Sequence, residues 1–212
     1  MRRVWMLPSA LIVMGMTTVP GGVAAGRTPA SGPPGRAPDA THVEVHDQFF
    51  SPTTVRVPRG GTVVFDFVGE GHHTATDDSD LALYDSGLVN GGGPSTSHTF
   101  AAAGVYRFTC TPHPSMGGRV EVPVRAVPAN GRLRDRFTVT WASAPPDEGF
   151  VQDVQVRRPG GGWKVWRDGV LGLSKTFRPD RGTGVYRFRA RLRNAAGDVS
   201  LWSLEAEIKV TR

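Results

Sequence analysis

The sequence predicts an all-β protein built from two Greek-key β-sandwiches. Short runs of alternating apolar and polar residues recur along the chain, as in RFTVTW (136–141) and YRFRARLR (186–193). This period of two indicates half-buried strands. No long segment has the i, i+3, i+4, i+7 apolar spacing of a helix. The 212 residues include 27 Gly and 17 Pro, which favours many turns, and the length fits two sandwiches of about 90 residues each.

The first 25 residues predict a signal peptide. Arg2 and Arg3 give it a positive start, an apolar stretch follows over residues 4–16, and Val23-Ala24-Ala25 has the small residues of a cleavage site. The apolar stretch is too short, and too broken by Pro8, for a stable membrane span. We therefore expect a secreted, extracytoplasmic protein of the cell envelope with no membrane span after cleavage. A retained N-terminal anchor is the alternative.

The rest of the chain divides by composition. Residues 26–40 are rich in Pro, Gly and Ala and predict an extended linker. A first β-domain is expected over residues 41–126 and a second over 135–212. Between them, residues 127–134 contain Pro128 and the Asn130-Gly131 turn signal, which predicts a short linker.

The two predicted domains differ in charge. Residues 41–126 carry nine acidic side chains against five arginines, whereas residues 132–212 carry sixteen basic side chains against nine acidic ones. The basic excess therefore belongs to the second half of the chain. Neither half has a phosphate-binding loop, a nucleophile triad or a general-base pair. We expect a protein that is not an enzyme and has no nucleic-acid partner.

The only cysteine lies in the sharpest motif of the chain. Cys110-Thr111-Pro112-His113-Pro114-Ser115-Met116 places a thiol, an imidazole and a thioether within seven residues. Thiolate and thioether ligands select Cu(I), and imidazole suits both oxidation states of copper. Two histidines and one cysteine in a trigonal set, with a distant axial methionine, form the blue-copper electron-transfer site. The motif predicts such a site but lacks its second histidine.

A second histidine is available far upstream. Gly71-His72-His73-Thr74 follows the predicted strand TVVFDFV (62–68), and a loop between neighbouring strands can bring this segment beside the cysteine loop. The chemistry of the residues alone does not choose between His72 and His73.

The segment around both motifs resembles the cupredoxins. CTPHPSMGGRVEV is similar to their ligand loop, and its Cys-x2-His-x2-Met spacing is closest to amicyanins and related plastocyanin-like proteins. HTAT (73–76), LYDSG (83–87) and SHTFAAAGVYRFTC (97–110) also resemble segments of this family. The resemblance covers about residues 41–124.

This resemblance implies the ligand set of one type 1 copper ion. It selects His73 over His72, which is expected to be an exposed neighbour. The implied ligands are His73, Cys110, His113 and Met116. Hydrogen bonds between Thr74 and Thr111 are expected to tie the two ligand segments together, because such bonds orient metal ligands.

The resemblance further implies electron transfer by Cu(II)/Cu(I) cycling. The imidazole edge of His113 is expected at the surface amid Pro112, Pro114 and Met116, where a redox partner protein would dock briefly. Because the protein fills all four coordination positions, no position is left for a substrate. We expect a monomer. Copper binding for storage or delivery is the alternative function.

The second half resembles fibronectin type III domains, which have an immunoglobulin-like fold. The similarity lies in RFTVTWASAPPDEGFVQDVQVRRPGGGWKVW (136–166) and GVYRFRARLRNAAGDVSLWS (184–203). Arg187, Arg189, Arg191 and Arg193 fall on the outward face of one strand. This ladder suits an anionic cell-surface polymer or an acidic redox partner, although a solvated strand face that discourages edge pairing is the favoured interpretation. A cell-surface interaction protein acting through this domain is a further alternative.

Overall fold

The computed structural model describes residues 40–212. The predicted signal peptide (1–25) and residues 26–39 of the predicted linker lie outside the described residues. Every regular element within residues 40–212 is a β-strand, which confirms the all-β prediction. Over the same residues no helix has the length and apolar character needed to cross a membrane.

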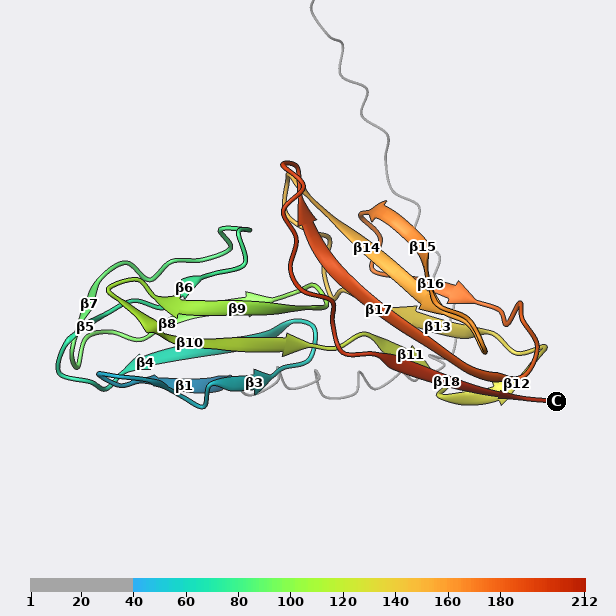
Figure 1. The fold of residues 1–212 in the computed structure, drawn as a ribbon, viewed down its shortest axis with the longest axis horizontal. Helices are drawn as coiled ribbons and strands as arrows, with labels where there is room; N and C mark the ends of the chain where they lie inside the picture. Colours follow the sequence, from blue (N-terminus) through green and yellow to red (C-terminus); the bar gives the residue numbers. More distant parts are fainter. Residues whose placement is uncertain (1–39) are drawn as a thin grey trace, which may run out of the picture. The chain divides into compact units, whose positions relative to one another are not determined.

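The first β-region is a two-layered sandwich (Figure 1). Its strands are β1 (Thr41–Val45), β2 (Phe50–Ser51), β3 (Thr54–Arg56), β4 (Gly61–Phe67), β5 (His72–His73), β6 (Thr76–Asp77), β7 (Val89–Asn90), β8 (Thr96–Phe100), β9 (Gly104–Cys110) and β10 (His113–Val122). Two four-stranded sheets have the orders β2-β1-β4-β8 and β3-β10-β9-β6, and β5 pairs with β7 alone. β1 runs parallel to β4, whereas β9 and β10 are antiparallel.

Strand alternation builds the core of this sandwich. Along β4 every second residue is buried, so Val63, Phe65 and Phe67 point inward. Phe108 on β9 meets Phe65 from the opposite sheet, with ring centroids 5.2 Å apart and the rings edge to face. Such aromatic contacts add to the burial of apolar area, and they hold together the two layers that support the loops at the end of β9.

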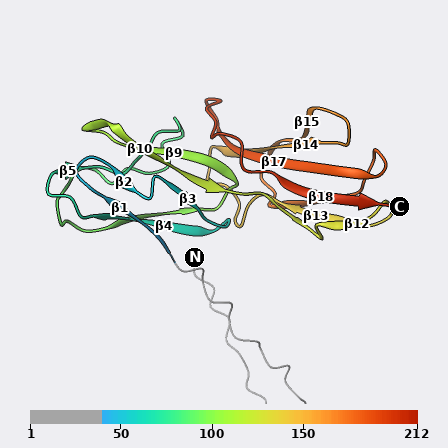
Figure 2. The same ribbon diagram turned by 60° about the horizontal axis from the view of Figure 1, so that its bottom comes forward.

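The second β-region is also a two-layered sandwich (Figure 2). Its strands are β11 (Arg125–Val127), β12 (Asn130–Arg132), β13 (Phe137–Thr140), β14 (Phe150–Arg157), β15 (Trp163–Val170), β16 (Ser174–Phe177), β17 (Gly184–Asn194) and β18 (Ala206–Thr211). They form sheets of order β11-β13-β16 and β12-β18-β17-β14-β15. Val139, Tyr186 and Phe188 lie in its separate core.

The stretch between the two sandwiches takes part in the second one. β11 pairs with β13, and β12, which lies inside the predicted linker 127–134, pairs in parallel with β18. Isolated bridges also connect Ala102 with Ala142 and Val105 with Leu201. The linker residues therefore contribute backbone hydrogen bonds to a sheet, while the domain boundaries themselves stay a prediction.

Candidate metal centre

The cysteine loop joins two antiparallel strands. Cys110 ends β9 and His113 begins β10, and the two residues face each other in the strand register. The register then shifts between His113 and Gly117, which is the mark of a β-bulge. Within this irregular stretch Pro114 and Ser115 are exposed, whereas the side chain of Met116 turns into the core and is 1% exposed.

The upstream histidine comes from the short ladder of β5 and β7. Adjacent residues of a strand point to opposite faces, so His72 and His73 have opposite environments. His72 is exposed, with its Nδ1 2.6 Å from Oδ1 of Asn90, as expected for a neighbour of the site. The side chain of His73 is buried and faces the cysteine loop.

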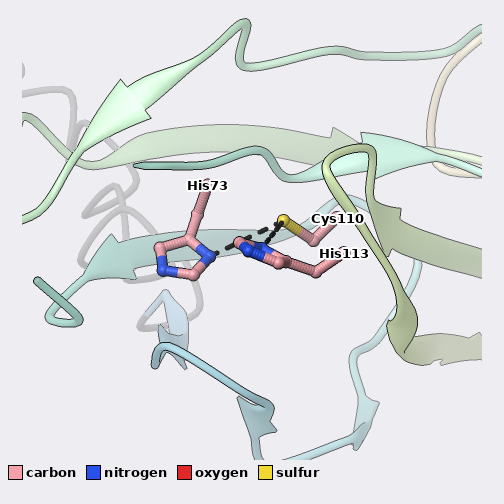
Figure 3. Close-up of side chains that lie close together, drawn as sticks. All are labelled: His73, Cys110 and His113. Atoms are coloured by element: carbon pink, nitrogen blue, oxygen red, sulfur yellow. Dashed lines mark hydrogen bonds between the residues drawn. The ribbon is translucent and has the colours of Figure 1, made fainter. Parts of the chain in front are cut away.

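Three side chains converge at this end of the sandwich (Figure 3). The Sγ atom of Cys110 lies 3.6 Å from Nδ1 of His73 and 3.5 Å from Nδ1 of His113. The donor atoms of the three residues all lie within 4.8 Å of one another. Cys110 is fully buried, whereas His113 is partly exposed.

These distances fit a metal ion. An ion in one plane with three donors, bonded at about 2.0 Å to nitrogen and 2.3 Å to sulfur, separates the sulfur from each nitrogen by roughly 3.7 Å. The two sulfur–nitrogen distances, 3.5 and 3.6 Å, are close to this value. Met116, the fourth predicted ligand, is buried in the same hydrophobic core as Cys110. One thiolate, two imidazoles and a thioether are donors that suit copper.

Hydrogen bonds fix both ligand segments. The backbone N–H of Thr74 donates to Sγ of Cys110 at 3.3 Å. The backbone N–H of Thr111 donates to Oγ1 of Thr74 at 2.8 Å, and the Thr74 hydroxyl donates to Oγ1 of Thr111 at 3.2 Å. The expected tie between Thr74 and Thr111 is confirmed. It holds the segment carrying His73 against the loop carrying Cys110 and His113.

One contact of the site was not foreseen from the sequence. The carboxylate of Asp47, between β1 and β2, accepts the backbone N–H of Gly71 at 2.8 Å, and its Oδ1 lies 3.2 Å from Nε2 of His73. The Gly71 hydrogen bond, and then that of His73, lower the pKa of Asp47 below its ordinary value. His46-Asp47-Gln48 matches no ligand motif and lies far from His73 in sequence, so no sequence signal marks it.

The surface beside the site lacks one of the residues that were expected there. A hollow there is lined by Asp47, Gln48, Gly71, His72, His73, Pro112 and His113. Pro112 and Pro114 are exposed as expected, but Met116 is not part of the surface. The bulge that turns its side chain inward removes it from the predicted apolar patch, so the prediction was wrong for this residue.

The fold and the donor set together define a β-sandwich protein with a mononuclear, sulfur-containing copper site. Residues 39–125 match the family model described as copper binding proteins, plastocyanin/azurin family. This part of the chain is a cupredoxin domain, and the prediction of copper as its cofactor is confirmed. The match does not extend to residues 126–212, where the fibronectin type III resemblance stays a prediction.

Several solved structures are similar to the same part of the chain. A purple cupredoxin from Nitrosopumilus maritimus is 26% identical, with 39% of this chain and 98% of that chain covered and a TM-score of 0.36. A plastocyanin from Dryopteris crassirhizoma is 30% identical, with 39% and 99% covered and a TM-score of 0.36. The P52G mutant of amicyanin is 25% identical, with 40% and 82% covered and a TM-score of 0.35. No curated protein matches the chain.

Proposed function

We propose that this protein is a secreted type 1 copper protein that carries single electrons, with His73, Cys110, His113 and Met116 as its ligands. The observation that carries the proposal is the convergence of the Cys110 sulfur with two ring nitrogens at 3.5 and 3.6 Å. Copper, when bound, supplies a couple between Cu(II) and Cu(I). Proteins of this family are electron carriers rather than enzymes, in agreement with the sequence prediction.

The surroundings of the ligands suit this role. Cys110, His73 and Met116 are buried in the sandwich, and Thr74 binds both ligand segments. A scaffold that holds its donors in place needs little rearrangement when the charge of the site changes. His113 is the one proposed ligand that is partly exposed. Electrons would therefore enter and leave through its imidazole, where Pro112 and Pro114 flank the surface presented to a redox partner.

For the second β-region we propose a fold but no binding partner. We infer a fibronectin type III-like module from its sequence resemblance and its two-sheet sandwich. Three arginines of its outward ladder form ion pairs, Arg187 with Glu207, Arg191 with Asp153 and Arg193 with Asp153. Arg189 stacks on two tryptophan rings and binds the side chain of Gln155. Because these four arginines already have partners within the domain, we propose no anionic polymer as a ligand of this face.

A copper titration of the purified full chain tests the proposed function. We expect one Cu(II) per chain and an intense blue thiolate-to-copper absorption band that disappears reversibly on reduction. The Cys110→Ser variant should lose the band because the sulfur donor is gone. His73→Ala should lose or strongly shift it, whereas the matched control His72→Ala should keep it, because His72 points to solvent.

Other results would contradict electron transfer. A colourless copper complex would exclude the thiolate as a ligand. Rapid loss of copper to a competing chelator in both oxidation states would favour storage or delivery instead. Equal effects of the two histidine substitutions would refute the assignment of His73.

A further inference from the structure

Asp47 reaches the metal centre from a loop that carries none of the proposed ligands. Its Oδ1 atom accepts the backbone N–H of Gly71 and lies 3.2 Å from Nε2 of His73. Two glycines make room for it. A Cβ atom on Gly69 would lie 2.6 Å from Oδ1 of Asp47, and one on Gly71 would lie 3.3 Å from both Oδ1 and Nε2 of His73.

The contact determines which ring nitrogen of His73 is free. A neutral imidazole has one N–H donor and one acceptor nitrogen, and an ionised carboxylate only accepts. The nitrogen that faces Asp47, Nε2, must therefore carry the proton. The other nitrogen, Nδ1, then directs its lone pair toward Cys110, 3.6 Å away. The His73 side chain is 1% exposed, so little water is available to replace the carboxylate.

The carboxylate also brings a negative charge to the site. A carboxylate hydrogen-bonded to a ligand imidazole makes the ligand more basic. A more basic ligand and a nearby negative charge both stabilise the more highly charged Cu(II) state relative to Cu(I). Asp47 is half exposed, so solvent screens part of the charge, but the hydrogen bond itself ends on a buried ring.

We propose that Asp47 is a positioning residue that holds His73 in its Nε2–H tautomer and lowers the reduction potential of the bound copper. This inference rests on the proposed function. It adds a charged partner from the β1–β2 loop to the four side chains that bind the metal.

Two substitutions at Asp47 separate the hydrogen bond from the charge. Asp47→Asn keeps an acceptor oxygen but removes the charge, and Asp47→Ala removes both. Asp47→Ala should weaken Cu(II) affinity roughly 10–100-fold. A tenfold loss of Cu(II) affinity relative to Cu(I) raises the potential of a one-electron couple by about 59 mV. Asp47→Asn should raise the potential by less, with a nearly unchanged blue band.

The matched control is Glu44→Gln, which removes a nearby negative charge that pairs with His46 rather than with His73. All potentials are measured on the copper-loaded full chain at one neutral pH. Potentials of both Asp47 variants that differ from the wild type by no more than the Glu44→Gln control would overturn the proposed effect on the potential.

A copper-free measurement tests the positioning role separately. Nitrogen-15 NMR of the metal-free chain should show His73 as the Nε2–H tautomer in the wild type and Asp47→Asn, and a mixture of tautomers in Asp47→Ala. An unchanged Nε2–H tautomer in Asp47→Ala would overturn the positioning role. A wild-type protein without the blue band would refute the proposed function instead, and the tautomer measurement would still decide the role of Asp47.

Discussion

Thr74 connects the two segments that carry the proposed ligands. Its backbone N–H donates to the Cys110 sulfur, and its hydroxyl oxygen accepts hydrogen bonds from the Thr111 backbone and from the Thr76 hydroxyl at 2.9 Å. The proposed ligand His73 directly precedes it. A single side chain therefore links the upstream ligand segment to the cysteine loop, and its loss should affect both the stability and the spectrum.

We expect Thr74→Val to lower the free energy of unfolding of the metal-free protein by about 1 kcal/mol. Valine has a similar shape but leaves the Thr111 N–H without its acceptor. The copper-loaded variant should show a shifted blue band, because the hydroxyl bonds to the cysteine loop are lost and only the Thr74 backbone N–H still binds the Cys110 sulfur. Urea unfolding and the visible spectrum measure these effects. Thr99→Val is the control, since Thr99 bonds to Thr62 on an exposed surface; equal effects of the two substitutions would contradict the role of Thr74.

Strand β10 carries Met116 and lies between two neighbouring strands. It pairs with β9 on one side and with β3 on the other. Gly118 has no room for a side chain, because a Cβ atom there would overlap the Phe108 ring and lie 2.6 Å from the backbone oxygen of Thr53. Glycine is therefore required for packing at this position.

Gly118→Ala should destabilise the first sandwich by about 1–3 kcal/mol, the usual cost of forcing an extra methyl group into a packed core. The neighbouring variant Gly117→Ala is the control, because its Cβ would meet only the Phe108 backbone oxygen at 3.4 Å. Thermal unfolding of both metal-free variants measures the difference. A Gly117→Ala protein that is as unstable as Gly118→Ala would show that chain conformation, rather than packing, limits this strand.

The strands could be predicted where alternation is strong. TVVFDFV corresponds to β4 and YRFRARLR lies within β17, because a face buried against another sheet imposes a period of two. β11 and β12 could not be predicted in this way, because a strand of three residues is too short to show a period of two. The ligand cluster was predictable because its donor types are rare and closely spaced. Asp47 was not, because its contact with His73 depends on loop geometry.

At the scale of the whole molecule, three of the four arginines on the outward face of β17 pair with acidic side chains although the second half keeps a basic excess. Asp153 has a central place there, with its side chain 9% exposed. It accepts hydrogen bonds from Arg191, from Arg193 and from the backbone N–H of Gly169. Burial alone would raise the pKa of Asp153. The hydrogen bonds, of which the one from Arg193 has the largest effect, outweigh burial and lower this pKa.

This shift predicts how stability depends on pH. Because the pKa of Asp153 is lower in the folded than in the unfolded protein, its contribution to stability is fully present above the ordinary pKa of 3.8 and is lost as the pH falls through the lower folded pKa. Asp153→Asn should cost about 1–2 kcal/mol at neutral pH, a reduced value because both arginines reach solvent.

The measurement is the unfolding midpoint of the metal-free protein across the acidic range. The gap between wild type and Asp153→Asn should narrow below about pH 3.8. Glu207→Gln, which removes an exposed partner of Arg187, should cost less than about 1 kcal/mol. A gap that stays constant with pH would show that Asp153 acts through its shape rather than its charge.

The complete burial of Cys110 has a consequence for the protein before copper arrives. Thiol–disulfide exchange requires one sulfur atom to reach another, and this sulfur has no exposed surface. Two metal-free molecules should therefore not become cross-linked through their thiols, even under oxidising conditions. Among the three clustered donors His113 alone is partly exposed, so we expect small oxidants and metal ions to approach the sulfur beside its ring.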